Sequence, residues 1–151
     1  MMSELDVEIK NCAFCAIARG EDPSAEVVCE GDSWIAFFPK EPATPGHTLV
    51  IPRKHVTDLW DVEPSLGSDL MAAVVRVGRA IDKALKPEGM NLITSSGKVA
   101  EQTVFHLHLH IVPRWRRDNF GKIWPIEGKK YEDTTLEAVA DRIRKACGST
   151  N

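Results

Sequence analysis

Residues 105–112 read FHLHLHIV, so that histidines alternate with apolar residues along one short segment. Side chains on a β-strand point alternately to opposite faces, and this alternation therefore predicts a strand over residues 104–112. One face of that strand carries the triad His106, His108 and His110. The other face is expected to pack in the core, and it carries Phe105, Leu107, Leu109 and Ile111. Three of the five histidines in the chain thus line one polar surface.

Four further segments are predicted to be strands, because each is a short apolar run bounded by turn residues. They are residues 26–30, 33–38, 47–52 and 90–94. The first two flank the dipeptide Gly31-Asp32, which is typical of a tight hairpin turn. Together with the histidine strand, they predict an α+β fold with a five-stranded antiparallel sheet.

The longest helix is predicted at residues 65–86, where apolar residues recur every three or four positions and Pro87 follows. Its apolar stripe comprises Leu66, Leu70, Val74, Val77, Ile81 and Leu85. A short N-terminal helix is expected between Asn11, which can cap it, and Gly20, which can end it. A C-terminal helix is predicted from Thr134, because TTLE has the form of a capping box. We expect this helix to bury three apolar residues, namely Leu136, Val139 and Ile143.

No internal repeat or linker interrupts the sequence, so we expect a single domain over residues 1–151. Its core is predicted at about residues 11–117, with a C-terminal extension at about 118–151. A net charge of −3 argues against binding a nucleic-acid polymer, which requires a basic face. No apolar run approaches the roughly 20 residues that cross a membrane. The polar start MMSELDVEIK does not resemble a signal peptide, so we expect a cytoplasmic protein with reduced cysteines.

The row of three imidazoles has three interpretations. It can be the exposed face of an amphipathic strand, a metal site, or a site for chemistry on phosphate. A neutral imidazole is a nucleophile and a protonated one is a donor, so a row of them can supply both functions. The flanking residues favour phosphate, because Gln102 and Thr103 offer an amide and a hydroxyl before the strand. After the strand, positive charge is added by Arg114, Arg116 and Arg117.

The pattern HLHLHIV, preceded by EQTVF, resembles the histidine triad family of nucleotide hydrolases and transferases. The upstream GHTLVIPRKH and the intervening GMNLITSSG strengthen the resemblance, which extends from about Cys12 to Trp115. It implies a homodimer with a continuous ten-stranded sheet. It also implies cleavage of the bond between a nucleoside 5′-monophosphate and its leaving group, in a nucleoside phosphoramidate or a dinucleoside polyphosphate.

The resemblance also assigns roles to individual residues. His108 is implied to be the nucleophile, which attacks the α-phosphorus and forms a nucleotidyl-histidine. Its other ring nitrogen must hold a hydrogen bond to fix the tautomer, and we expect a backbone carbonyl as the acceptor. His110 and Thr103 are implied to contact phosphate oxygens or the leaving group. His47 is implied to join the surrounding hydrogen-bond network, and Gln102 to lie beside the phosphate.

Three positions depart from the pattern of many relatives, which carry Asp at Pro39, Asn at Ser95 and Gly at Glu101. These departures leave the reaction class unchanged and bear on nucleoside preference and rate. Ser95 is included among the expected substrate-binding residues. Trp115 and Asn119 follow the histidine strand directly and are candidate specificity residues.

An apolar nucleoside pocket is expected from the first hairpin and the next strand, with Ile35, Phe37 and Leu49 as candidate lining residues. Plain core packing is an equal alternative for each of them. Two other functions remain open from the sequence. One is a nucleotide-binding regulatory module with weak catalysis, and the other is a zinc-binding interaction protein in which all three triad histidines serve the metal.

The motif CAFC places Cys12 and Cys15 in the predicted N-terminal helix. A redox pair, two buried thiols and half of a zinc site are the alternatives, and zinc is favoured because no strand precedes the motif as in a thioredoxin-like unit. A subset of histidine triad proteins carries such a pair. In that subset, the resemblance implies completion by His55 and His106, giving a closed structural zinc site.

Overall fold

The computed structural model describes residues 9–124 and 132–148, and it divides into two compact units at residues 1–120 and 121–151. Each unit is described by itself. No helix among the described residues is long and apolar enough to span a membrane. The predicted core, residues 11–117, lies in the first unit.

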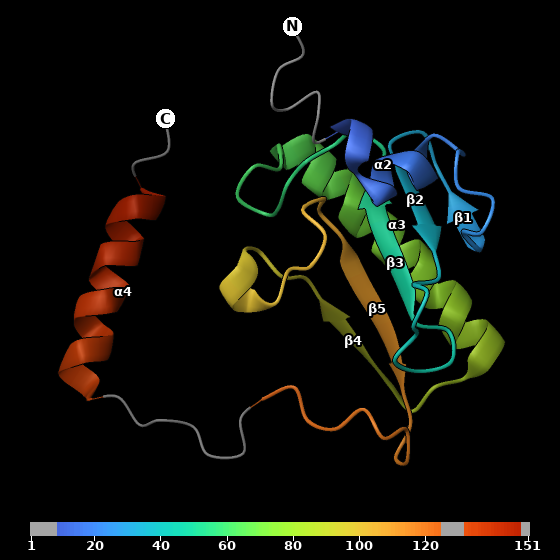
Figure 1. Cartoon of the computed structure of the whole chain (residues 1–151). Helices are drawn as coiled ribbons and strands as arrows, with labels where there is room; N and C mark the ends of the chain where they lie inside the picture. Colours follow the sequence, from blue (N-terminus) through green and yellow to red (C-terminus); the bar gives the residue numbers. More distant parts are fainter. Residues whose placement is uncertain (1–8, 125–131, 149–151) are drawn as a thin grey trace, which may run out of the picture. The chain divides into compact units, whose positions relative to one another are not determined.

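The first unit contains one five-stranded antiparallel sheet, which confirms the predicted α+β fold (Figure 1). The strands follow the order β1-β2-β3-β5-β4 across the sheet. Their bounds are β1 (Val27–Glu30), β2 (Trp34–Phe37), β3 (Thr48–Pro52), β4 (Gly89–Ile93) and β5 (Leu109–Arg114). The predicted hairpin is β1–β2. β5 lies between β3 and β4, and His110 pairs with Leu49 on one side and with Ile93 on the other.

Helix α3 (Pro64–Leu85) crosses one face of the sheet, within one residue of its predicted bounds (Figure 1). Proline suits the first helical turn, where its missing N–H has no intrahelical acceptor. The helix ends where Lys86 adopts the left-handed conformation. Leu85 is 42% exposed, so the apolar stripe stops one turn earlier than predicted.

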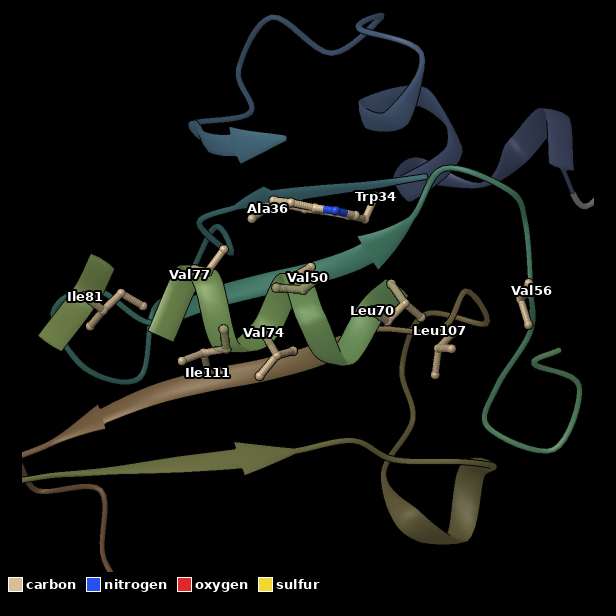
Figure 2. Close-up of a cluster of buried hydrophobic side chains, with 11 residues drawn as sticks. Trp34, Ala36, Val50, Val56, Leu70, Val74, Val77, Ile81, Leu107 and Ile111 are labelled. Atoms are coloured by element: carbon tan, nitrogen blue, oxygen red, sulfur yellow. The ribbon is translucent and has the colours of Figure 1, made fainter. Parts of the chain in front are cut away.

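The main core lies between α3 and the sheet, as Figure 2 shows. Leu70, Val74 and Val77 project from the helix toward Val50 and Ile111 of the central strands. The complete cluster comprises Trp34, Ala36, Val50, Val56, Leu70, Ala73, Val74, Val77, Ile81, Leu107 and Ile111. Burial of this apolar surface provides the main driving force for packing the helix on the sheet.

The short helix α2 (Ala13–Ala18) packs against strand side chains that do not belong to the main core under α3. Its buried cluster comprises Ile17, Ala18, Ile35, Phe37, Leu49 and Ile51. The prediction that Asn11 caps this helix is wrong, because Cys12 is the N-cap residue and its sulfur accepts the N–H of Cys15. Gly20 lies just beyond the helix end with a φ of +74°, a conformation that favours glycine.

The predicted strand over residues 104–112 is only partly correct, because β5 begins at Leu109. Its neighbour β3 ends at Pro52, which lacks an N–H and whose carbonyl accepts a bond from the ring of His106. The ladder therefore stops there, although Leu107 still packs in the main core. The prediction that Phe105 packs in the core is wrong, because 40% of it is exposed.

The second unit contains α4 (Asp133–Cys147). The predicted capping box is wrong, because Glu132 is the N-cap residue and makes no side-chain capping bond within the described residues. Acidic Asp133 in the first turn and basic residues in the last turn suit the helix dipole. The three residues predicted to be buried are instead exposed by 51%, 44% and 57%: Leu136, Val139 and Ile143. The second unit has too few other residues to cover the apolar face of a helix of this length.

Candidate active site and metal centre

The four residues predicted to bind zinc come together in the structure, and their ligand atoms all lie within 4.8 Å of one another: Cys12, Cys15, His55 and His106. The Nδ1 atom of His106 lies 3.5 Å from both cysteine Sγ atoms. The Nδ1 atom of His55 lies 3.2 Å from the Sγ of Cys15. The two cysteines lie at the start of α2 and His55 follows β3, so the fold assembles a cluster from separate parts of the chain.

Hydrogen bonding orients His106 toward this cluster. Its Nε2–H donates to the carbonyl of Pro52 at 2.9 Å, which leaves the lone pair on Nδ1 facing the thiols. Burial lowers the pKa of His106 to about 4, so the ring is neutral at pH 7. The Nε2 atom of His55 is buried and has no hydrogen-bond partner among the described residues. Both imidazoles therefore present Nδ1 to the cluster.

The donor set and its spacing fit a zinc ion. Zinc–sulfur bonds of ~2.3 Å and zinc–nitrogen bonds of ~2.0 Å in a tetrahedral site place the donor atoms roughly 3.3–3.8 Å apart. The nitrogen–sulfur separations of 3.2 and 3.5 Å are close to this range. Burial and the neighbouring Cys12 raise the pKa of the Cys15 thiol to about 11, and a divalent cation would reverse this shift by stabilising the thiolate.

His108, the middle histidine of the triad, is held through one ring nitrogen. Its Nδ1–H donates to the carbonyl of His106 at 2.7 Å, the backbone acceptor that the sequence led us to expect. This bond leaves the lone pair on Nε2. Burial lowers the pKa of His108 below its ordinary value of 6.5, so the neutral, nucleophilic form prevails at pH 7. The 5% exposure of His108 shows that little of the ring reaches solvent.

A chain of hydrogen bonds fixes the tautomers of His47 and His110. The N–H of Ala43 donates to Nδ1 of His47 at 3.0 Å, so the proton of a neutral His47 ring is on Nε2. That Nε2–H donates to Nδ1 of His110 at 2.9 Å. His110 consequently keeps its own proton on Nε2, where it is a donor. Burial, with smaller effects of His108 and His47, lowers the pKa of His110 to about 4.

Phe14 contacts both His106 and His108 and was not identified from the sequence. Its ring centroid lies 5.9 Å from that of His106 and 5.3 Å from that of His108, at interplanar angles of 73° and 84°. These are edge-to-face contacts. Its position between the two cysteines of CAFC was the available signal, because a side chain there must lie near whatever the cysteines bind.

Gln102, predicted beside the phosphate, has its amide occupied by the surrounding loop. Its Oε1 accepts the N–H of Gly97 at 2.7 Å, and its Nε2 donates to the carbonyls of Thr57 and Val104 at 2.7 and 3.2 Å. Its 3% exposure agrees with a role in ordering this loop. Glu101 is exposed with a φ of +66°, which explains why glycine would suit its position.

Thr103 is exposed and lines a cavity of about 500 Å³ beside the metal cluster. The cavity is lined by Asn11, Cys12, Ala13, His55, Thr103, Val104 and Phe105. A leaving group of moderate size has room there. The contact of Thr103 with such a group stays a prediction.

The candidate nucleoside-pocket residues Ile35, Phe37 and Leu49 are buried, with exposures of 4%, 2% and 3%. They form part of the cluster beneath α2, so the structure places them in packed core. Ser95 is half-buried between β4 and the turn at residues 98–100, and Pro39 is half-buried after β2. A role of these residues in binding a nucleoside stays a prediction.

Trp115 and Asn119 lie in the turn after β5, which is held by an ion pair between Arg114 and Asp118 at 2.5 Å. Trp115 is half-buried, and its N–H donates to Asp118 at 3.0 Å. Asn119 is exposed with a φ of +58°. Their proposed part in specificity stays a prediction.

The interpretation that all three triad histidines bind one metal is wrong for this structure. Within the described residues, the group of converging metal-ligating side chains contains His106 and excludes His108 and His110. The rings of His108 and His110 instead meet edge to face, with centroids 4.9 Å apart and an interplanar angle of 66°. The three rings therefore do not converge on one point, because His106 lies in the cysteine–histidine cluster and the other two lie outside it.

Comparison with known proteins identifies the family of this chain. A family model described as the HIT domain matches residues 19–117. The chain is 36% identical to the protein hit of Bacillus subtilis, over 93% of this chain and 97% of that protein. It is 32% identical to adenylylsulfatase HINT3 of Arabidopsis thaliana, over 88% of this chain and 66% of that protein.

Among solved structures, a zinc-bound histidine triad family protein from Mycobacterium smegmatis is similar, with a TM-score of 0.69 and 34% identity. The similarity covers 91% of this chain and 98% of that chain. The family match spans well over half of the sequence and includes the whole histidine triad. The chain therefore belongs to the HIT, or histidine triad, family.

Proposed function

We propose that this protein is a nucleotidyl hydrolase or transferase that acts through a covalent nucleotidyl-His108 intermediate. Nucleotide hydrolysis and nucleotidyl transfer are the general activities of the HIT family, and one relative is named an adenylylsulfatase. The observation that carries the proposal is the hydrogen bond from Nδ1 of His108 to the His106 carbonyl. It sets the tautomer that a nucleophilic Nε2 requires.

In the first step, the Nε2 lone pair of His108 forms a bond to the α-phosphorus. The bond from phosphorus to the leaving group breaks, and its electron pair departs with that group, which takes a proton from solvent. The ring gains positive charge as the new bond forms, so the carbonyl of His106 accepts a stronger hydrogen bond in the transition state. In the proposed mechanism, the Nε2–H of His110 donates to a non-bridging phosphate oxygen.

In the second step, a water oxygen attacks the same phosphorus. The bond between phosphorus and Nε2 breaks, its electrons return to the ring of His108, and the proton of the water goes to solvent. The product is a nucleoside monophosphate. An alcohol, amine or phosphate in place of water makes the same protein a transferase or phosphorylase.

We further propose that Cys12, Cys15, His55 and His106 hold one structural zinc ion. Zinc would supply a rigid tetrahedral link between α2 and the residues that follow β3. The four protein ligands would fill the site and leave no coordination position open for substrate. The similar zinc-bound protein from Mycobacterium smegmatis supports this assignment.

The proposed substrates are nucleoside phosphoramidates and dinucleoside polyphosphates, and we propose that the protein is a cytoplasmic homodimer. The sheet offers support for pairing, because β4 is an edge strand with Met90 and Leu92 exposed by 39% and 45%. Sedimentation at several protein concentrations tests the dimer, and a monomer throughout that range would contradict it.

Rapid-quench intact-mass spectrometry tests the central proposal. The protein is mixed with an adenosine phosphoramidate or diadenosine tetraphosphate and quenched in the millisecond range. We expect a mass increase of one adenylate in the unmodified protein and in a surface control, Glu137→Ala, which alters only exposed α4. His108→Ala should form no adduct while still binding adenosine monophosphate. Turnover by His108→Ala would refute the role of this ring, and nucleotide binding without any adduct would favour a regulatory binding module.

A further inference from the structure

His106 belongs to the metal cluster and to the active site at the same time. Its Nδ1 faces the two thiols, its Nε2–H is held by Pro52, and its backbone carbonyl accepts the Nδ1–H of His108. A displacement of the His106 ring therefore moves the acceptor that fixes the His108 tautomer. The metal cluster and the proposed nucleophile are linked through one residue.

Phe14 of α2 provides a second link between the metal cluster and His108. Its ring meets His108 edge to face at 5.3 Å and is itself packed against Phe37 at 5.4 Å. The backbone that carries Phe14 belongs to α2, a helix of only six residues. Such a helix has too few internal hydrogen bonds to be stable alone, so its position depends on its contacts.

The contacts at the start of α2 are those of the two cysteines that flank Phe14. Cys12 caps the helix through its sulfur, which accepts the N–H of Cys15 at 3.4 Å, and both sulfurs face His106. An ion bound by both sulfurs would fix the backbone on each side of Phe14. Without it, this turn is held by weak thiol hydrogen bonds, by the backbone bond from the N–H of Ala16 to the carbonyl of Cys12, and by apolar contacts such as that of Phe14 with Phe37.

We propose that Phe14 is a positioning residue which, together with the carbonyl of His106, makes the orientation of the His108 ring depend on an occupied metal site. The inference rests on the proposed function in one respect, namely that His108 is the nucleophile. It adds that the metal site governs the rate of the chemical step although no metal ligand touches the substrate phosphorus.

The test compares the unmodified protein, Phe14→Leu and a control, Phe38→Leu, each loaded with zinc and after chelation. Phe38 lines a cavity against α3 with Val77 and Ile81, and among the described residues it makes no ring contact with the triad. Three quantities are measured: bound zinc, the NMR signal of the His108 Nδ1–H, and the rate of adduct formation. The signal is assigned from its loss in His108→Ala.

We expect zinc-loaded Phe14→Leu to bind as much zinc and adenosine monophosphate as the unmodified protein. Its His108 Nδ1–H signal should shift and exchange faster with water, and adduct formation should slow by about tenfold, as for other outer-shell groups. Phe38→Leu should match the unmodified protein. Removing zinc should change the signal strongly in the unmodified protein and less in Phe14→Leu, because one of the two links is already broken in that variant.

An unchanged signal and rate in zinc-loaded Phe14→Leu would overturn the proposal, as would equal effects of zinc removal in all three proteins. If the unmodified protein forms no adduct, the proposed function fails, and the Nδ1–H signal still decides whether Phe14 positions the ring. If chelation unfolds the protein, the comparison of the three zinc-loaded proteins decides alone.

Discussion

Gly46 directly precedes His47, the residue that orients His110, and its conformation gives a sharp prediction. Its φ is +79°, a region that side-chain-bearing residues rarely adopt. A Cβ added at this position would lie 2.4 Å from Cδ1 of Leu85 and 3.5 Å from Pro113. We therefore expect Gly46→Ala to destabilise the fold and to disturb the position of His47.

The size of the effect follows from two contributions. Left-handed backbone costs an alanine about 1–2 kcal/mol. The contact with Leu85 is relieved cheaply, because that side chain is 42% exposed at the end of α3, at an off-rotamer cost of about 0.5–1.5 kcal/mol. Alanine also restricts the unfolded chain, which offsets about 0.4–1 kcal/mol. The net loss of unfolding free energy is thus about 0.5–3 kcal/mol.

Gly67→Ala is the matched control, because the same substitution should have the opposite sign there. Gly67 lies inside α3, and no described atom outside the helix backbone lies within 4 Å of an added Cβ. Alanine should raise the unfolding free energy at this position by about 0.5–1 kcal/mol. Urea denaturation at fixed zinc concentration measures both variants. Equal effects, or a stable Gly46→Ala protein with unchanged adduct formation, would refute the reasoning.

Three further predictions concern the active site and the metal. Burial lowers the pKa of His108 below 6.5, and protonation removes the lone pair of the ring. The acid limb of the rate of adduct formation should therefore be centred below pH 6.5. A limb centred above pH 6.5 would contradict this. His110→Ala should slow adduct formation by about 100-fold or more, measured by rapid quench, because it removes a donor to the phosphate. Free zinc at 100 times its dissociation constant should raise the unfolding free energy by about 2.7 kcal/mol. Cys12→Ser should abolish that increase, and an equal increase in the variant would exclude the proposed ligand set.

The sequence predicted α3 within one residue, because a stripe of 3.6-residue period and a following proline mark both its face and its end. The start of β5 was missed for a different reason. Alternation specifies which side chains share a face, but a strand ends where its partner stops offering hydrogen bonds. Here that limit is set by Pro52, which the histidine pattern does not reveal.

The proposed metal ligands show how much of a site the spacing of residues in the sequence can predict. CAFC is a local signal, whereas His55 and His106 lie 40 and 91 residues beyond Cys15. Only the family resemblance indicated those partners before the structure brought the donor atoms together. For the apolar residues Ile35 and Phe37, neither source suffices, because lining a nucleoside pocket and packing a core require the same side chains.

We propose that the histidines of the triad serve two sites that share one backbone. His106 points toward the thiols while its carbonyl meets the ring of His108 two positions along. A substitution of His106 removes its metal-binding ring but leaves its carbonyl in the chain. Any effect of that substitution on the His108 tautomer must therefore arise from movement of the backbone, and this distinguishes a positioning role of the metal from a chemical one.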